Sequence, residues 1–223
     1  MKALIRPYGS HDRDAIRHIY AETAFFGEPV EAYFDDRELY GDLGIDPYLN
    51  RCADYIFVAD DGDAIAGYVL GSPTGDVGNR QWTLRMLPVV LLRLAGGRYR
   101  VGRKTLAHVL AETTAALRGE LLEIRSDEYP ANLHINLLPQ YRGQGLGSAL
   151  MRAYLDNLRN HGIAGVHVVS SDRNGAALRM YERFGFAVLA ERTTRMWARH
   201  VGGEPVRLIG LGLRLAQGMC KVA

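Results

Sequence analysis

The fold is decided by residues 133–147, which read LHINLLPQYRGQGLG. Their first six residues, rich in leucine and isoleucine, are typical of a short strand, and three glycines follow within five positions. Leu150, Tyr154 and Leu158 then recur at helical spacing, which predicts a helix over 148–160. A second apolar run at 166–169 completes a strand–turn–helix–strand unit. Such a crossover makes its two strands parallel, so the sequence predicts an α/β fold.

A glycine-rich turn at the start of a helix is typical of an anion site, because backbone N–H groups converge there and the helix dipole adds positive charge. Arg142 adds a cation to the three glycines. A nucleotide triphosphatase loop needs Gly-Lys-Ser/Thr, whereas Gly147 runs directly into Ser148. A dinucleotide fold needs G-x-G-x-x-G near the first strand and an acid about twenty residues later. Neither pattern fits, and on the glycines alone a purely structural loop remains an alternative.

The neighbouring residues narrow the choice. The loop reads Gln140-x-x-Gly143-x-Gly145, and about thirty residues later the chain reads Asn174-x-x-Ala177-x-x-x-Tyr181-x-x-x-Gly185-Phe186. These two motifs, in this order and spacing, resemble the signature loop and the second motif of the GNAT superfamily of N-acetyltransferases. The resemblance implies an α/β GNAT fold, with a mixed central sheet, a splayed parallel strand pair and flanking helices.

The resemblance also implies an acetyl-CoA-dependent N-acetyltransferase that transfers the acetyl group to a primary amine by direct attack. Tyr181 is then the general acid that protonates the leaving thiolate, with a core aromatic residue as the alternative role. A backbone N–H near Leu137 or Leu138 is expected to polarise the thioester carbonyl. The residues expected to hold acetyl-CoA are Leu137, Leu138, Gln140, Arg142, Gly143, Gln144, Gly145, Leu146, Gly147, Asn174, Ala177 and Tyr181.

Three further segments narrow the resemblance. Residues 34–41, 66–71 and 129–139 are similar to the acetyltransferase-like domain of animal O-GlcNAcases and its free-standing bacterial relatives. That branch includes members whose acetyl transfer is doubtful. An acyl-CoA-binding or sensor module is therefore the alternative function.

The general base is the missing part of the motif. Many enzymes of this kind place an acid near the strand before the loop, but position 136 is Asn136. His134 shares its strand face, and its ordinary pKa near 6.5 suits proton acceptance through water, so it is the candidate base. A structural histidine is the alternative. The other histidines show no metal-ligand spacing, and no metal is expected.

Charge is unevenly distributed although the net charge is only +2. Residues 28–46 hold seven acids and one base, and residues 80–104 hold seven bases and no acid. Both stretches suit solvated faces, or else Asp35, Asp36 and Glu38 belong to a groove that binds a cationic acceptor amine. Residues 98–104 contain one aromatic residue and no recognised motif, so no nucleic-acid partner is expected.

The 223 residues suit one domain over 1–223, with a helical insertion at about 71–130 that carries helices near 82–94 and 104–118. Residues 24–50 are expected to be irregular. The strand predicted at 206–213 offers an edge for pairing, so a monomer or homodimer is expected. Two cysteines, the lack of a secretory signal and the lack of a membrane-spanning run favour the cytoplasm and no membrane partner.

Overall fold

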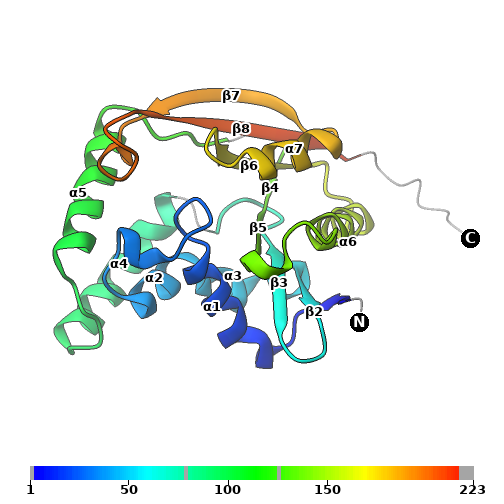
Figure 1. The fold of residues 1–223 in the computed structure, drawn as a ribbon, viewed down its shortest axis with the longest axis horizontal. Helices are drawn as coiled ribbons and strands as arrows, with labels where there is room; N and C mark the ends of the chain where they lie inside the picture. The colour runs from blue at the N-terminus through cyan, green and yellow to red at the C-terminus, as the bar shows by residue number, and fades with distance from the viewer. Residues whose placement is uncertain (1–2, 78–79, 125–126, 216–223) are drawn as a thin grey trace, which may run out of the picture.

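Two four-stranded sheets build the molecule (Figure 1). The computed structural model describes residues 3–77, 80–124 and 127–215. The first sheet is antiparallel, and its strands run in the order β1 (Leu4–Pro7), β2 (Ile56–Asp60), β3 (Ile65–Leu70) and β5 (His134–Leu137). In the second sheet only the first pair is parallel, and the order is β4 (Ala131–Asn132), β6 (Gly165–Ser171), β8 (Val206–Arg214) and β7 (Ala187–Thr194).

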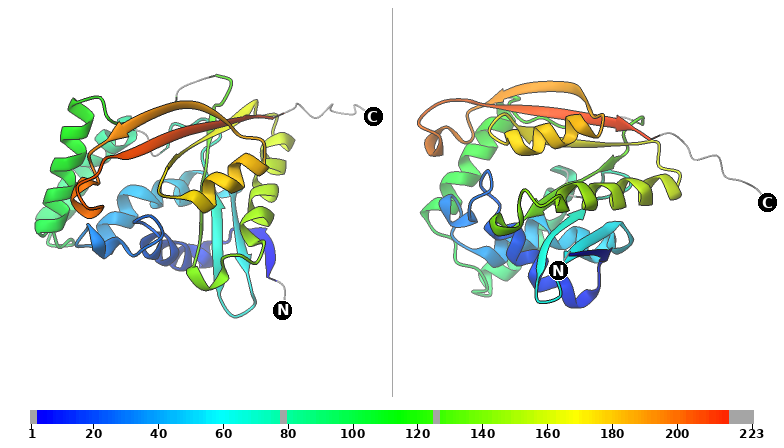
Figure 2. Two further views of the ribbon diagram at one scale, coloured as in Figure 1. Left: turned by 45° about the horizontal axis from the view of Figure 1, so that its top comes forward. Right: turned by 45° about the vertical axis from the view of Figure 1, so that its right-hand side comes forward.

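Over the residues described, seven α-helices surround and separate these sheets. In the views of Figures 1 and 2, α6 lies between the two sheets and α5 stands at one end of the molecule. In Figure 1, α1 to α3 lie to the left of β2 and β3. The α-helices are α1 (Arg13–Glu22), α2 (Arg37–Gly44), α3 (Asp46–Arg51), α4 (Arg80–Ala95), α5 (Arg103–Leu117), α6 (Leu146–Asn160) and α7 (Gly175–Arg183). Short 3₁₀ turns cover Ser10–Asp12, Val30–Ala32, Ala53–Tyr55, Pro139–Tyr141 and Ala198–His200.

Helix α6 holds the main core together. Leu150, Tyr154 and Leu158, the stripe expected from the sequence, are all fully buried. They belong to one apolar cluster that includes Val69 of β3 and Val166 of β6, so α6 packs against both sheets. Full burial of a leucine side chain contributes about 1.5–3 kcal/mol, which makes this stripe a large part of the core's stability.

The chain changes sheets between β4 and β5, at Leu133. Asn132 fixes this point, because its side chain accepts a hydrogen bond from the Ser72 N–H (2.7 Å) and donates one to the Tyr48 hydroxyl (3.0 Å). The Tyr154 hydroxyl donates to the Asn132 carbonyl at 2.6 Å. The predicted parallel pairing therefore runs through β4 and not through residues 133–138. The α/β class and the splayed strand pair are confirmed. The strands form an antiparallel sheet and a mixed sheet, whereas the sequence predicted one mixed central sheet.

Other expectations need correction. Residues 24–50 are irregular only in their first part, because α2 and α3 form from Arg37 onward. Asp36 caps α2, and its carboxylate accepts a hydrogen bond from the Leu39 N–H at 2.8 Å. Strand β8 lies between β6 and β7, so the 206–213 strand is not an edge and the predicted route to a homodimer is wrong. In the described part of the chain, no helix is long and apolar enough to cross a membrane. The single domain with an insertion stays a prediction.

Candidate active site

The loop between β5 and α6 owes its shape to two glycines. Gly143 and Gly145 have φ angles of 77° and 83°, a left-handed conformation that side-chain-bearing residues rarely adopt. A Cβ atom at either position would meet no atom within 4 Å. The glycines therefore leave the outer side of the loop open, so that a ligand can approach the backbone.

Helix α6 begins at this open side, two residues earlier than the sequence predicted. Gly145 is its N-cap, and the N–H groups of residues 145–148 have no partner within the helix. A 15-residue helix presents partial positive charge at this end. The N-terminus of α6 is therefore suited to an anionic group such as a phosphate.

A cavity of about 640 Å³, here called the loop cavity, lies along the loop and the start of α6. Strand β5, helix α7 and residues 23–27 form its other walls. Its lining residues are Thr23, Phe26, Gly27, Ile135, Asn136, Leu137, Arg142, Gly143, Gly145, Gly147, Ser148, Asn174, Ala176, Ala177, Arg179, Met180, Glu182 and Arg183. Three arginines against one glutamate, together with the α6 amides, make this donor set suitable for a polyanionic ligand.

Seven of the predicted ligand residues line the loop cavity: Leu137, Arg142, Gly143, Gly145, Gly147, Asn174 and Ala177. The others, which do not line it, are Leu138, Gln140, Gln144, Leu146 and Tyr181, together with the candidate base His134. Sequence reasoning missed Arg179, Met180 and Arg183, although their spacing on α7 marks one helix face. It also missed Phe26 and Gly27, which no local motif connects to the loop.

The backbone of β5 distinguishes between Leu137 and Leu138. The Leu138 N–H donates to the Ala66 carbonyl at 3.0 Å and so completes the pairing with β3. In an antiparallel pair successive residues alternate in direction, so the Leu137 N–H points away from β3. Leu137 also lines the loop cavity. Of the two predicted N–H groups, that of Leu137 is the one that points away from β3, on the side where the two sheets separate.

Arg142 connects the loop to a distant segment. Its Nε donates to the Leu137 carbonyl at 3.1 Å, and its Nη2 donates to the Gly27 carbonyl at 3.2 Å. The guanidinium thus crosses the loop cavity wall and fixes residues 25–28 relative to β5. Its charge remains beside the cavity, as the sequence predicted, but its hydrogen bonds go to the backbone.

Helix α7 carries the second motif. The Asn174 side chain caps the helix by accepting a hydrogen bond from the Ala177 N–H at 3.3 Å. Tyr181 lies on the core side of α7, is only 4% exposed, and its ring packs 5.4 Å from that of Phe186. Within the described chain, Asp46 alone has a side-chain polar atom that is both fully buried and unpaired. The Tyr181 hydroxyl, which has no hydrogen-bond partner there, therefore keeps some contact with solvent-accessible space.

The side chains of His134 and Asn136 contact tyrosines beside the first sheet. The His134 Nε2 lies 3.2 Å from the Tyr48 hydroxyl, and the Asn136 amide donates to the Tyr68 hydroxyl at 3.0 Å. Although the His134 residue as a whole is exposed, burial of its ring against Tyr48 lowers its pKa, and the nearby charge of His167 adds to that effect. A lowered pKa keeps the imidazole neutral but makes it a weaker base. The assignment of His134 as base stays a prediction.

The predicted acceptor residues contact the basic stretch. The Asp35 carboxylate accepts a hydrogen bond from the Thr105 N–H and that of Asp36 accepts one from the Arg100 N–H, both at 2.8 Å. Glu38 pairs with Arg98 at 2.5 Å. None of the three acids lines the loop cavity. Their acceptor role stays a prediction, and ion pairs of Arg98 with Glu38 and of Arg93 with Asp42 join the acidic and basic stretches.

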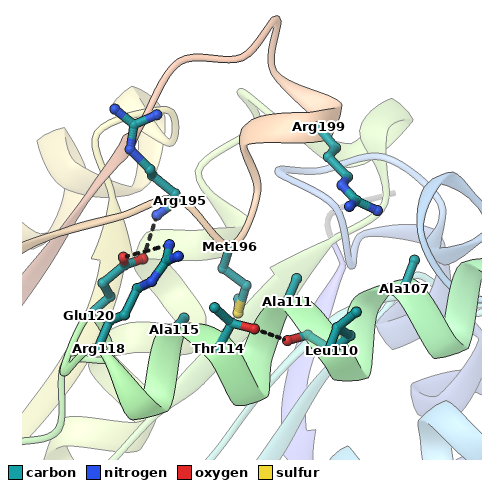
Figure 3. Close-up of a pocket in the computed structure, with 10 residues that line it drawn as sticks. All are labelled: Ala107, Leu110, Ala111, Thr114, Ala115, Arg118, Glu120, Arg195, Met196 and Arg199. Carbon is teal, nitrogen blue, oxygen red and sulfur yellow. Dashed lines mark hydrogen bonds and ion pairs between the residues drawn. The ribbon is translucent and has the colours of Figure 1, made fainter.

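A second, smaller cavity of about 190 Å³ lies between α5 and residues 195–199 (Figure 3). Met196 points onto α5, and the Glu120 carboxylate accepts a hydrogen bond from the Arg195 N–H at 2.8 Å. This cavity is too small for a coenzyme-sized ligand. Its contacts instead attach the connection between β7 and β8 to α5.

Comparison with known proteins identifies the family. The model of the acetyltransferase (GNAT) family matches residues 13–186. The chain belongs to this family. The GNAT and acyltransferase predictions are therefore confirmed, whereas the narrower likeness to O-GlcNAcase domains stays a prediction. Among GNAT structures, that of SsHAT is 29% identical, with a TM-score of 0.69, and the alignment covers 97% of this chain and 100% of that one.

Two GNAT relatives and a further structure complete the comparison. Mycothiol acetyltransferase of Acidimicrobium ferrooxidans is 35% identical over 89 residues, which are 40% of this chain and 25% of that protein. An uncharacterized N-acetyltransferase of Mycobacterium bovis is 34% identical over 83 residues, 37% of this chain and 53% of that protein. The chain thus spans about half or less of the curated relatives it matches. An acetyltransferase of Salmonella typhimurium, solved with acetyl-CoA, shares the fold at 16% identity, with a TM-score of 0.57 and coverage of 100% of this chain and 99% of that one.

Proposed function

We propose that this GNAT acetyltransferase transfers the acetyl group of acetyl-CoA to a primary amine by direct attack. The loop cavity carries the proposal, because it joins the open glycine loop, the α6 N-terminus and the Leu137 N–H in one space. Its volume, about 640 Å³, lies within the range of sites for ligands of this size. Acetyl-CoA, when bound, supplies the reactive thioester.

The chain's own residues fit that ligand in three places. The α6 amides with Arg179 and Arg183 suit the phosphates. Gly147 suits the arm that follows, because it lines the cavity beside Leu137 and Met180 without a side chain; a Cβ there would lie 3.3 Å and 3.4 Å from these two side chains. The Leu137 N–H is directed to the splay, where it can polarise a thioester carbonyl.

Two further groups complete the proposed chemistry. Tyr181 is the proposed general acid, and burial raises the pKa of its phenol, so that it holds its proton at neutral pH. The base is not an acid of β5, because Asn136 occupies that place. His134, acting through water, remains the predicted proton acceptor.

An acyl-CoA-binding module is the second candidate. The observation that favours it is the contact of Asn136 with Tyr68, which places a neutral hydrogen-bonded amide where a carboxylate would accept the proton. Both candidates need the loop cavity, but only the first needs turnover.

The test is Gly143→Glu, assayed by calorimetry with acetyl-CoA and by release of coenzyme A thiol with a panel of amines. A carboxylate at the open side would repel the phosphates, so we expect binding and turnover both to be lost. Gly202→Glu is the matched control, because Gly202 also has a positive φ (75°) and open surroundings but lies in the connection to β8. Unchanged acetyl-CoA affinity in Gly143→Glu would refute the proposal. Binding without turnover of any amine in the unaltered protein would favour the module.

A further inference from the structure

The loop cavity has an aromatic end that the GNAT motifs do not explain. Phe26 lines the cavity, and its ring centre lies 4.8 Å from that of Phe25 and 5.8 Å from that of Trp197. Further rings continue from there and form what we call the ring cluster. Its members are Phe25, Phe26, Tyr33, His108, Trp197 and His200.

The backbone holds Phe26 in an uncommon conformation. Its φ is 50°, the only positive φ at a residue other than glycine in the described chain. The turn closes with two hydrogen bonds of 2.8 Å between Phe25 and Glu28, and Arg142 fixes the Gly27 carbonyl from the loop. A bulky residue in the left-handed region is costly and persists where its surroundings force it, typically at functional sites.

Trp197 is fixed from the opposite side. The segment before it is attached just beyond the end of α5, because the Glu120 carboxylate accepts a hydrogen bond from the Arg195 N–H (Figure 3). The same carboxylate accepts one from the Thr194 hydroxyl. The Trp197 ring then packs 5.1 Å from that of His108 and 4.9 Å from that of Tyr33. Trp197 does not line the loop cavity itself, but its ring packs on Phe26, which does. Two separately anchored segments therefore bring their rings together beside this end of the cavity.

The charges at this end favour an apolar partner. Burial lowers the pKa of His108 to about 4, so this member of the ring cluster is uncharged at neutral pH. The acids Asp35, Asp36 and Glu38, which could have recognised a second ammonium group, make hydrogen bonds or ion pairs with residues 98–105 instead. Flat apolar groups gain both area burial and ring-to-ring contact against such a surface.

We infer that the acceptor is an amine that carries an aromatic ring, and that Phe26 and Trp197 bind this ring. The inference rests on the proposed acetyl transfer and specifies the acceptor of that same site. The acceptor's amine then lies in the loop cavity near the Leu137 N–H, and its ring lies against the ring cluster. Phe26 and Trp197 are specificity residues, not participants in the chemistry.

The test compares 2-phenylethylamine with 1-butylamine and spermidine at saturating acetyl-CoA. We expect kcat/KM to be at least about tenfold higher for 2-phenylethylamine, and Trp197→Ala to remove most of this preference while kcat/KM for 1-butylamine stays within about twofold. Phe26→Gly should also reduce the preference for 2-phenylethylamine, and it keeps the turn because glycine accepts a φ of 50°. Tyr55→Ala is the control, since it removes a half-buried ring that packs on His161 instead.

Equal kcat/KM for all three amines, or a preference for spermidine, would overturn the inference and leave the acetyl transfer standing. If the unaltered protein acetylates no amine, the proposed function fails and binding decides the inference. Calorimetry would then be done on the protein saturated with coenzyme A. Tighter binding of 2-phenylethylamine than of 1-butylamine, lost in Trp197→Ala, would support the ring site, and equal binding would refute it.

Discussion

Tyr181→Phe separates catalysis from packing. The change removes one hydroxyl and keeps the ring, which is 4% exposed and packed on Phe186. Because this hydroxyl has no partner in the described chain, its loss breaks no hydrogen bond, and the free energy of unfolding should change by less than about 0.5 kcal/mol. If the hydroxyl protonates the leaving thiolate, kcat should fall about 100-fold, which corresponds to ~2.7 kcal/mol of the barrier.

The assay measures kcat, KM and acetyl-CoA affinity for both proteins, with urea unfolding alongside. Affinity should change little, since the α6 amides and the cavity arginines supply most contacts with the phosphates. Burial raises the pKa of Tyr181, so the hydroxyl stays protonated and the ratio of the two kcat values should stay constant from about pH 6 to 9. Tyr154→Phe is the contrast, because its hydroxyl donates to Asn132 and its loss should cost about 1 kcal/mol of stability. An unchanged kcat in Tyr181→Phe would refute the general-acid role and return Tyr181 to the core.

Two more predictions test the charges around the site. Replacing Asp35, Asp36 and Glu38 together by alanine should lower the free energy of unfolding by at least the ~1 kcal/mol of the Asp36 helix cap, measured in urea, and leave the acceptor KM unchanged; a KM that rises at low salt would restore these acids to an acceptor groove. His108 has a pKa of about 4 in the folded chain against an ordinary value near 6.5, so the unfolded chain binds more protons between these values. The contribution of neutral, buried His108 to the free energy of unfolding is therefore complete above about pH 7 and decreases as the pH falls towards 4. Stability should drop by up to about 2 kcal/mol between pH 7 and pH 5, and less in His108→Phe; an identical decline in both proteins would contradict this assignment.

The sequence predicted the loop cavity's central part because its signals are local. The positive φ of Gly143 and Gly145 follows from residue type, and the Asn174 cap follows from its place before a helical pattern. Tyr181 shows the limit of such reasoning. Spacing placed it on one face with Asn174 and Ala177, but a helix of nine residues lies with one side on the core and one side at the cavity, and the ring of Tyr181 turned to the core.

Charge patterning gave the weakest guidance, because pairing partners are far apart along the chain. The acids of 28–46 and the bases of 80–104 each read as a free charged surface. In the fold Asp42 contacts Arg93 and Arg17, and the Tyr99 hydroxyl donates to it at 2.7 Å. A run of one sign shows that a surface is charged, but only the tertiary structure shows whether a second run covers it. Asp35, Asp36 and Glu38 likewise contact residues 98–105, and their role in an amine groove stays a prediction.

The proposed chemistry depends on the point where the chain leaves the second sheet after β4 and enters the first sheet at β5. Local sequence pattern predicted this point least well. Apolar and polar residues alternate without interruption over 131–137, yet the strand breaks at Leu133 because Asn132 is held by Ser72, Tyr48 and Tyr154. Gly71 allows this contact, since a Cβ there would lie 1.9 Å from the Asn132 carbonyl oxygen. With β4 held in one sheet and β5 in the other, the Leu137 N–H faces no strand on its cavity side. The contacts of Asn132 lie well outside the recognised motifs, yet they create the unpaired N–H on which the proposed acetyl transfer relies.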